Sequence, residues 1–378
     1  MGFETGNSGN KLFSSVIKIG PECSIEGAFC QFLGERVAPK IFAVISEGYV
    51  MSKLEQVPRV KDLLQRIEQL LEEEVWNRSS QDYDVGQVNY KEYHANLGLP
   101  VPDWVVPEKF CLTHGDPSVS NTMIREDGSL VLIDPRPPRG FVPSCRETDA
   151  ARILQSFFGW ENSCYGEQFF NYLLPRFWDD KEFRNRALFW CAATTVRIKY
   201  LEQSKENPKN NIIKWCNETK QLCFDLIEGI AIILFTDKHK IPFIIDIADY
   251  EEVSKYKWSI HHTYVTRWDR TKLTNLLCGK APIGLVTDHI NQNRLDNRRK
   301  NIRFVTQGLN TYNSFIPSTN TSGIKGIHPK KTKSGIKWEI YFSVHGKRVW
   351  LGLHNTKEEA IIARQEAEKL FYPELYNV

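Results

Sequence analysis

The chain has 378 residues, of which 41% are hydrophobic and 25% charged. This length is too great for one small core, and the apolar fraction is too high for a disordered chain, so we expect two or three globular domains. The formal net charge of +3 hides an uneven distribution. Residues 1–228 contain 26 Lys and Arg against 32 Asp and Glu, whereas residues 229–378 contain 23 against 14. The basic part is therefore the part expected to meet nucleic acid.

The cysteines and the apolar segments indicate in which cellular compartment the protein is expected. The nine cysteines are scattered, without a C-x-x-C pair or a spacing with histidine that is typical of a metal site. This pattern favours reduced thiols in a cytoplasmic protein. No apolar run is long enough to cross a bilayer, so we expect neither a signal peptide nor a membrane partner. The oligomeric state is left open.

The beginning of the chain is expected to alternate strands and helices. Residues 14–18 (SSVIK) predict a strand, residues 24–34 a helix, and YVMSKL near residue 50 another strand. A charged, Leu-rich run over residues 59–76 predicts a second helix. These elements lead into the first segment with recognisable chemistry.

Residues 113–139 (THGDPSVSNTMIREDGSLVLIDPRPPR) bring several oxygen ligands together. The carboxylate of Asp116 is followed five residues later by the amide of Asn121. A turn and a strand then deliver a second carboxylate, Asp134. Oxygen ligands from a loop and from the end of a strand can hold Mg²⁺ against phosphate groups.

This segment resembles the catalytic core of the aminoglycoside/choline-kinase branch of the protein-kinase-like fold, in which H-G-D-x-x-x-x-N forms the catalytic loop. The resemblance implies that Asp116 is the base that accepts the proton of a substrate hydroxyl. It also implies that Asn121 and Asp134 coordinate Mg²⁺ beside ATP. Asp149, in E-T-D-A-A-R, would brace the catalytic loop.

The same resemblance covers the rest of residues 1–228, which we expect to form a two-lobed kinase-like phosphotransferase domain. Lys18, in V-I-K, stands where the family places the lysine on the ATP phosphates, and Glu26 is its expected helix partner. Only five residues precede Gly6, so the small lobe is expected to be truncated. An active kinase for a hydroxylated small molecule and a domain that has lost its activity both stay open.

The pattern changes at about Gly229. Residues 235–268 alternate apolar and polar positions and are rich in aromatic and β-branched residues, which predicts short strands interrupted by a helix at DYEEVSKY. They lead to residues 286–313 (VTDHINQNRLDNRRKNIRFVTQGLNTYN).

The Asp-His pair of this stretch has the chemistry of a hydrolytic site. Asp288 can bind a hard divalent cation through oxygen, and His289 titrates near neutral pH and so can deprotonate a water. Asn301 and Asn310 follow at spacings that allow one to order a loop and the other to complete a metal site.

This stretch resembles the HNH (ββα-metal) nuclease motif of phage-type homing endonucleases, over V-x-D-H-I-N-x-N-R-L-D-N-R-R-x-N-I-R-x-V-T. The lead-in I-D-x-x-D-Y-x-x-V-S-x-Y-K-W resembles these nucleases too, although Leu-Thr-Asn at residues 273–275 stands where many members have Leu-His-Arg. The resemblance implies an HNH endonuclease domain over residues 229–317 that cleaves double-stranded DNA with Mg²⁺ or Mn²⁺.

The resemblance also assigns roles within the motif. His289 would be the general base, Asp288 and Asn310 the metal ligands, and Asn301 the brace of the loop, a role that Asn297 could share. Backbone phosphates of DNA are expected to meet the basic side chains of the motif: Arg294, Arg298, Arg299, Lys300 and Arg303.

Residues 318–378 predict a smaller module. Two alternating strands flank a turn at His345-Gly346, and Thr356 with Glu359 three residues later predicts the capped start of a helix. Small residues at helical spacing on that helix, Ala360, Ala363 and Ala367, would let it lie close to a sheet.

The module resembles the APETALA-type (ethylene-response-factor) DNA-binding domain, a three-stranded sheet with one helix, in S-G-I-K-G-I, K-W-E, G-K-R-x-x-L-G and E-E-A. The resemblance implies that the sheet lies in the major groove. For each of its two tryptophans, a position in the core and a contact with DNA are equally favoured interpretations. The candidate contacts are Lys325, Lys337, Trp338, Arg348 and Trp350.

The sequence thus predicts a multidomain α+β chain with a kinase-like domain, a ββα-metal nuclease domain and a DNA-binding module. The favoured function is a metal-dependent DNA endonuclease of the mobile-element type, joined to a kinase-like domain. A small-molecule phosphotransferase with an acquired DNA-binding tail and a non-catalytic DNA-binding protein are the alternatives. In-frame fusion of a nuclease gene to a resident kinase gene would account for the step in charge.

Overall fold

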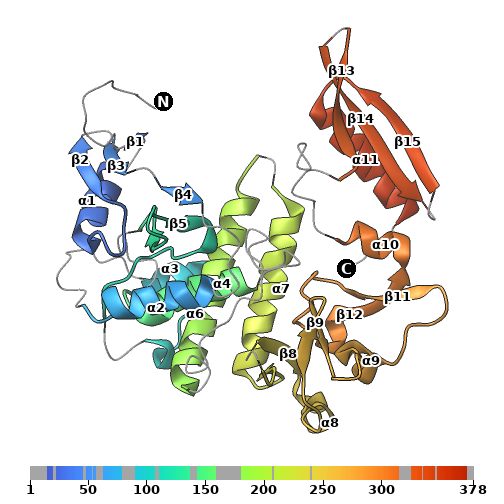
Figure 1. The fold of residues 1–378 in the computed structure, drawn as a ribbon, viewed down its shortest axis with the longest axis horizontal. Coiled ribbons are helices and arrows are strands. Elements are labelled where there is room, and N and C mark those ends of the chain that lie inside the picture. The colour runs from blue at the N-terminus through green and yellow to red at the C-terminus, as the bar shows by residue number, and fades with distance from the viewer. Residues whose placement is uncertain are drawn as a thin grey trace. The chain divides into compact units, whose positions relative to one another are not determined.

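The computed structural model describes residues 15–19, 23–45, 48–52, 54–56, 63–78, 90–106, 110–136, 143–158, 180–206, 208–238, 241–314, 325–333, 335–344 and 347–372. Packing divides the chain into two compact units. Unit 1 contains residues 1–273 and 293–298, and unit 2 contains residues 274–292 and 299–378. The boundaries predicted after residues 228 and 317 do not coincide with this division and stay predictions. Both units mix helices with small sheets of two or three strands (Figure 1).

Unit 1 begins with an antiparallel sheet of order β1-β3-β2, in which β3 pairs with both other strands. Its elements are β1 (Ser15–Ile19), α1 (Cys23–Leu33), β2 (Ile41–Ile45) and β3 (Gly48–Ser52). The strand and helix predicted at this end are confirmed. Lys18 lies in β1 and Glu26 in α1, but their side chains fall outside the described part of the chain, so their predicted pairing stays a prediction.

A second sheet, of order β4-β5-β6, supports the H-G-D segment. Its strands are β4 (Glu55–Gln56), β5 (Thr122–Ile124) and β6 (Leu130–Leu132). β5 begins at the residue after Asn121, and β6 ends two residues before Asp134. The β5–β6 hairpin therefore brings the two predicted metal ligands to the same end of the sheet, since Thr122 pairs with Leu132.

Helices supply most of the core of unit 1. In α2, Leu63, Ile67 and Leu71 recur every four residues, so they line one face of the helix and are buried. Asp180 caps the longest helix, α6, by accepting a hydrogen bond from the backbone N–H of Phe183. α6 and α7 pack against each other along their lengths (Figure 1). The helices are α2 (Leu63–Glu74), α3 (Tyr90–Asn96), α4 (Arg146–Phe157), α6 (Lys181–Gln203) and α7 (Asn210–Ile227).

The predicted lead-in to the nuclease motif also packs within unit 1. β8 is buried on both faces, and its Ile244 donates a hydrogen bond to Leu295 O and accepts one from Asn297 N, both 2.7 Å long. Residues 293–298 therefore lie beside β8. The short strands and the helix predicted here are confirmed as β7 (Ala231–Phe235), β8 (Pro242–Asp246), α8 (Tyr250–Val253), β9 (Ser259–His261) and β10 (Tyr264–Thr266).

Unit 2 contains a hairpin followed by a helix. β11 (Leu285–His289) pairs antiparallel with β12 (Ile302–Thr306), and α10 (Gln307–Tyr312) follows directly. Thr306 ends the strand and caps the helix, since its hydroxyl accepts a hydrogen bond from Leu309 N. A short helix, α9 (Leu273–Cys278), precedes the hairpin. The order strand, strand, helix is the one that the sequence predicted for this segment.

The C-terminal part of unit 2 is a three-stranded antiparallel sheet with one helix on one face (Figure 1). Its elements are β13 (Ile327–Thr332), β14 (Gly335–Val344), β15 (Lys347–His354) and α11 (Lys357–Phe371). Thr356 and Glu359 form the predicted capping box at the start of α11. Ala360 and Ala367 are buried, as expected for a helix close to a sheet. The predicted turn at His345-Gly346 lies outside the described residues.

Two expectations from composition can be compared with the structure. None of the seven cysteines whose side chains the structure describes forms a disulfide. Within the described ranges, no helix has the length and apolar character needed to cross a membrane.

Candidate functional sites

The H-G-D loop of unit 1 is held by a buried carboxylate. Asp149, in the first turn of α4, accepts hydrogen bonds from the backbone N–H groups of His114 (2.8 Å) and Gly115 (2.7 Å). The indole N–H of Trp76 donates to the same carboxylate at 3.1 Å. Asp149 is completely buried. This is the bracing contact that the resemblance implied, and it fixes the backbone just before Asp116.

Burial shifts the protonation of this loop in two opposite ways. It raises the pKa of Asp149 to about 6, although the N–H groups that donate to the carboxylate act to lower this pKa. It lowers the pKa of His114 to about 4, so that the imidazole is neutral near pH 7. The Nε2 atom of His114 is buried and has no hydrogen-bond partner within the described part of the molecule.

Gly115 is required by the close approach of two segments. Its φ is +83°, a region that side chains rarely adopt. A Cβ atom there would lie 2.2 Å from the carbonyl oxygen of Arg136. The two segments are also joined by a 2.8 Å hydrogen bond from Arg136 N to His114 O. The H-G-D loop and the D-P-R segment are therefore one packed unit.

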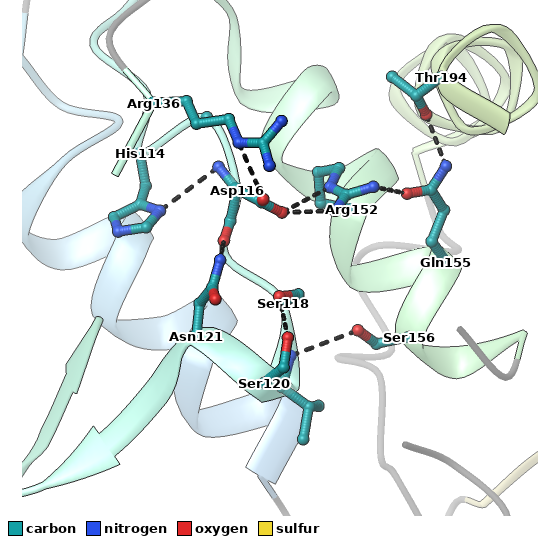
Figure 2. A network of polar contacts seen from close by, with 12 residues as sticks. His114, Asp116, Ser118, Ser120, Asn121, Arg136, Arg152, Gln155, Ser156 and Thr194 are labelled. Atoms are coloured by element: carbon teal, nitrogen blue, oxygen red, sulfur yellow. Dashed lines mark hydrogen bonds and ion pairs between the residues drawn. The ribbon is translucent and has the colours of Figure 1, made fainter. Parts of the chain in front are cut away.

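Asp116 lies between two arginines (Figure 2). The Nε and Nη2 atoms of Arg152 donate to its Oδ1 at 2.8 and 2.5 Å, and Arg136 Nε lies 3.1 Å from its Oδ2. Burial alone would raise the pKa of Asp116, but the two guanidinium groups outweigh it and lower the pKa below its ordinary value. Asp116 is therefore a carboxylate at neutral pH. Neither arginine was among the residues predicted from the sequence.

The two predicted metal ligands of this site flank Asp116. Asn121 donates from Nδ2 to Asp116 O at 3.0 Å, which leaves its amide oxygen on the other side of the group (Figure 2). Asp134 has a φ of 55°, a strained value for a residue other than glycine, and such residues cluster at functional sites. An amide oxygen and a carboxylate are hard donors that fit Mg²⁺.

In unit 2, the predicted nuclease residues gather on the hairpin. Asp288 and His289 end β11 and are buried. Asn301, just before β12, accepts a 2.9 Å hydrogen bond from Asn291 N on its side-chain oxygen and another from Ile290 N on its carbonyl oxygen. Asn301 therefore fixes the two residues after His289, which is the geometry expected of a loop brace.

Two described side chains bind the carboxylate of Asp288. Arg303, its direct neighbour across the hairpin, donates from Nε at 2.9 Å. Asn313, at the end of α10, donates from Nδ2 to both carboxylate oxygens at 3.0 Å and to His289 O at 2.9 Å. Asn313 was not predicted. Its signal in the sequence is the spacing of three residues from Asn310, which places both on one side of the helix end.

Asn310 lies half-buried on α10, the helix that follows the hairpin. Together with Asp288 it offers one carboxylate and one amide oxygen, a donor set that fits Mg²⁺ or Mn²⁺. No cluster of three or more His, Cys, Asp or Glu suited to a metal occurs among the residues that the structure describes. A metal at the hairpin would therefore depend on amide ligands.

The expected DNA contacts of the motif fall into two groups. The expectation for Arg298 is wrong, because its guanidinium is buried and paired with Asp225 and Asp296, each at 2.7 Å. Arg298 instead joins the 293–298 segment to α7 within unit 1. Arg299 and Lys300 are exposed, and the Arg294 guanidinium lies 4.6 Å from the centre of the Tyr264 ring.

The expected DNA contacts of the C-terminal sheet also include both exposed side chains and side chains engaged by the protein. Lys325 is half-buried: Nζ donates to carbonyl groups at the end of α10, including Tyr312 O at 2.8 Å, and burial lowers its pKa to about 8. Trp338 packs on the core between the sheet and α11, whereas 58% of Trp350 is exposed. Arg348 is exposed with its guanidinium 3.7 Å from the centre of the Tyr341 ring, and Lys337 is half-buried.

Comparison with known proteins gives weak similarity of two kinds. No family model matches the chain. The chain is 25% identical over 147 residues to an uncharacterized HNH endonuclease of Acanthamoeba polyphaga mimivirus, covering 36% of this chain and 78% of that protein. It is 33% identical over 70 residues to protein 3.8 of Escherichia phage T7, covering 18% of this chain and 56% of that protein.

Among solved structures, the chain is similar to one assigned provisionally as a fructosamine-3-kinase of Thermobifida fusca. The sequence identity is 15% and the TM-score 0.36, with 58% of this chain and 93% of that chain covered. A TM-score of this size does not serve as evidence for the fold. The case for each site therefore depends on its own geometry.

Proposed function

We propose that residues 286–313 form the active site of a metal-dependent DNA endonuclease of the HNH type. The observation that carries this proposal is the Asn301 brace, which orders the loop after His289 in a strand-strand-helix unit. The similarity to a viral HNH endonuclease supports it. The basic balance of residues 229–378 is the charge expected of a part that binds DNA.

The roles follow from the residue types and their positions. His289 accepts the proton of the attacking water, and Asn301 holds the loop that orients it. Asp288 and Asn310 hold one Mg²⁺ or Mn²⁺, which supplies positive charge beside the scissile phosphate. Arg303 and Asn313 position the carboxylate of Asp288 through the hydrogen bonds described above.

DNA contacts are proposed for the exposed basic and aromatic side chains. In the nuclease motif these are Arg299 and Lys300, and we add Arg294, which is half-buried five residues before Arg299. In the C-terminal sheet the exposed pair Arg348 and Trp350 can meet phosphates or bases, and Lys337 lies on the same sheet.

A plasmid-nicking assay with a Mg²⁺ titration tests the metal-ligand assignment. The expected product is a nick, because one HNH site cuts one strand. Replacing Asn310 with Ala removes one metal ligand, so the Mg²⁺ concentration for half-maximal nicking should rise about tenfold or more. Asn355→Ala, in an exposed loop, is the matched control and should leave the titration unchanged. Equal titrations for the two variants would refute the assignment of Asn310.

A second function is proposed for unit 1, a phosphotransferase that moves the γ-phosphoryl group of ATP to a hydroxylated small molecule. The contacts that favour it are the Asp149 brace and the bond from Asn121 to Asp116 O. Asp116 would accept the hydroxyl proton, while Asn121 and Asp134 would hold Mg²⁺ and Lys18 with Glu26 would meet the nucleotide.

ATP turnover in the presence of hydroxylated compounds tests this second function. Replacing Asp116 with Ala should reduce turnover by about 100-fold or more, the usual contribution of a positioned base. Turnover that is absent, or that does not depend on Asp116, would leave unit 1 without this activity.

A further inference from the structure

The carboxylate of Asp116 is shared between two guanidinium groups of very different exposure. The side chains are 6% exposed for Asp116, 14% for Arg152 and 64% for Arg136. A base that serves only to accept a proton needs neither arginine, and their positive charge makes the carboxylate a weaker base. The two arginines therefore call for separate explanations.

Arg152 is fixed from behind. Its Nη1 atom donates to Gln155 Oε1, and Gln155 Nε2 donates in turn to Thr194 Oγ1 (2.7 Å) and Thr195 Oγ1 (3.0 Å) on α6. Figure 2 shows this chain of contacts from Asp116 to Thr194. With its other two nitrogens on Asp116, each of the three nitrogens of Arg152 donates to a protein group. It is a positioning residue for the carboxylate.

Arg136 is fixed at its backbone but open at its tip. Its backbone N–H is bonded to His114 O, and its Nε lies 3.1 Å from Asp116 Oδ2. No further side-chain partner of Arg136 occurs in the part of the chain that the structure describes. A guanidinium has five N–H donors arranged in a planar fork, and those on the two terminal nitrogens of Arg136 have no hydrogen-bond partner among the described residues.

We propose that Arg136 binds a phosphate group of the ligand that enters beside Asp116. A planar fork matches two oxygens of a phosphate, and Arg152 already balances the charge of Asp116, which leaves the positive charge of Arg136 for an incoming anion. The phosphate can belong to a nucleotide or to a phosphorylated acceptor. This inference rests on the second proposed function in taking the site to handle phosphates, but it concerns binding and does not require turnover.

The shared contact also makes Asp116 a competitor of the ligand. Arg136 Nε forms an ion pair with Asp116 Oδ2, so the carboxylate holds the guanidinium in place and its negative charge repels an incoming anion. Replacing Asp116 with Asn keeps the shape but removes the charge. Phosphate binding should therefore become tighter in Asp116→Asn and weaker in Arg136→Gln, two opposite changes at one site.

The test is calorimetric binding to the full-length protein without Mg²⁺, with pyrophosphate, ATP, glycerol 3-phosphate and, as the uncharged counterpart, glycerol. Arg136→Gln should weaken the binding of phosphate ligands about tenfold, the effect of losing a charge-assisted hydrogen bond at a partly exposed position. Arg36→Gln is the matched control, since Arg36 is 76% exposed and paired with one carboxylate, Glu74. It should bind as the wild type does.

The choice of ligands distinguishes a phosphate of the nucleotide from a phosphate of the acceptor. A loss confined to ATP and pyrophosphate assigns Arg136 to the nucleotide, and a loss with glycerol 3-phosphate assigns it to the acceptor. No phosphate binding by the wild type, or equal affinities of wild type and Arg136→Gln, would overturn the proposal. Thermal unfolding of each variant checks that a loss of binding is not a loss of folding. Phosphate binding without ATP turnover would support this inference while refuting the phosphotransferase.

Discussion

Two loops of this molecule solve the same problem with different side chains. The H-G-D loop of unit 1 is braced by the buried carboxylate of Asp149, which accepts two backbone N–H groups and the indole of Trp76. The loop after His289 in unit 2 is braced by the amide of Asn301, whose side-chain oxygen accepts one backbone N–H. In both, the residue next to the braced segment is the proposed base.

The difference has a physical consequence. A buried carboxylate can accept several donors, but it titrates, and burial raises the pKa of Asp149 to about 6. An amide accepts less and does not titrate. The geometry of the H-G-D loop is therefore linked to pH, whereas the brace of the nuclease hairpin is not.

The anchoring of the nuclease motif in unit 1 can be broken at Arg298. Changing Arg298 to Met leaves the buried carboxylates of Asp225 and Asp296 without a cation, which should lower the free energy of unfolding by about 3–5 kcal/mol. Chemical denaturation measures it. Arg299→Met, one residue along on an exposed position, should cost about 1 kcal/mol or less. A small loss for Arg298 would mean that the buried cluster is not formed.

The dependence of stability on pH that the H-G-D loop causes can be measured with a substitution of His114. Its folded pKa of about 4 lies below the ordinary 6.5, so its contribution to stability is lost as pH falls from about 6.5 to about 4. The folded pKa of Asp149, about 6, lies above the ordinary 3.8, so its contribution is lost as pH rises through about 4 to 6. The two contributions oppose each other.

Removing the imidazole should leave only the contribution of Asp149. Relative to wild type, the stability of His114→Gln should rise by about 3 kcal/mol between pH 6.5 and pH 4. Denaturant unfolding at several pH values gives this difference directly. A constant difference between the two proteins across that window would contradict the burial of a neutral His114.

The close packing of the H-G-D loop can be tested at Gly115. An alanine there must hold a positive φ and place its Cβ against Arg136 O, so we expect a loss of about 2–3 kcal/mol. Gly128 has nearly the same φ, +81°, but open space around its Cβ position. Gly128→Ala should therefore cost only about 1 kcal/mol, and equal losses for the two variants would show that the close approach is absent.

The smallest expected effect on stability is at the amide brace. Asn301→Ala removes the part-buried hydrogen bond that the side-chain oxygen accepts from Asn291 N, and should lower the free energy of unfolding by about 1–2 kcal/mol. The rate of plasmid nicking should fall by more than the lower fraction of folded protein explains, since the loop that orients His289 is released. If Asn301→Ala nicks DNA at the wild-type rate, Asn301 is a structural residue alone.

The sequence predicted what local patterns determine. The capping box of Thr356 and Glu359, the hairpin that carries Asp288 and His289, and the spacing from Asp116 to Asn121 all depend on residues close together in the chain. Periodicity and spacing are enough for such features, because neighbouring residues share an element.

The partners of charged side chains could not be read in this way. Arg298 and Asp225 are 73 residues apart, and Arg152 and Asp116 are 36 residues apart, so only tertiary packing brings them together. The sequence therefore predicted a DNA contact for every basic residue of the motif. It did not distinguish Arg299, which lies on the surface, from Arg298, which is buried. The partners of Lys325 could not be read from the sequence for the same reason, since the carbonyls that bind it end a helix of another segment.

The central claim is that His289 is the base of a DNA endonuclease, and its most direct test is the rate of Mg²⁺-dependent plasmid nicking by purified full-length protein. His289→Ala should reduce that rate by about 100-fold or more, the usual contribution of a general base. His328→Ala, at an exposed position of the C-terminal sheet, should nick within about twofold of the wild type if the account holds. Equal nicking by wild type and His289→Ala would contradict it.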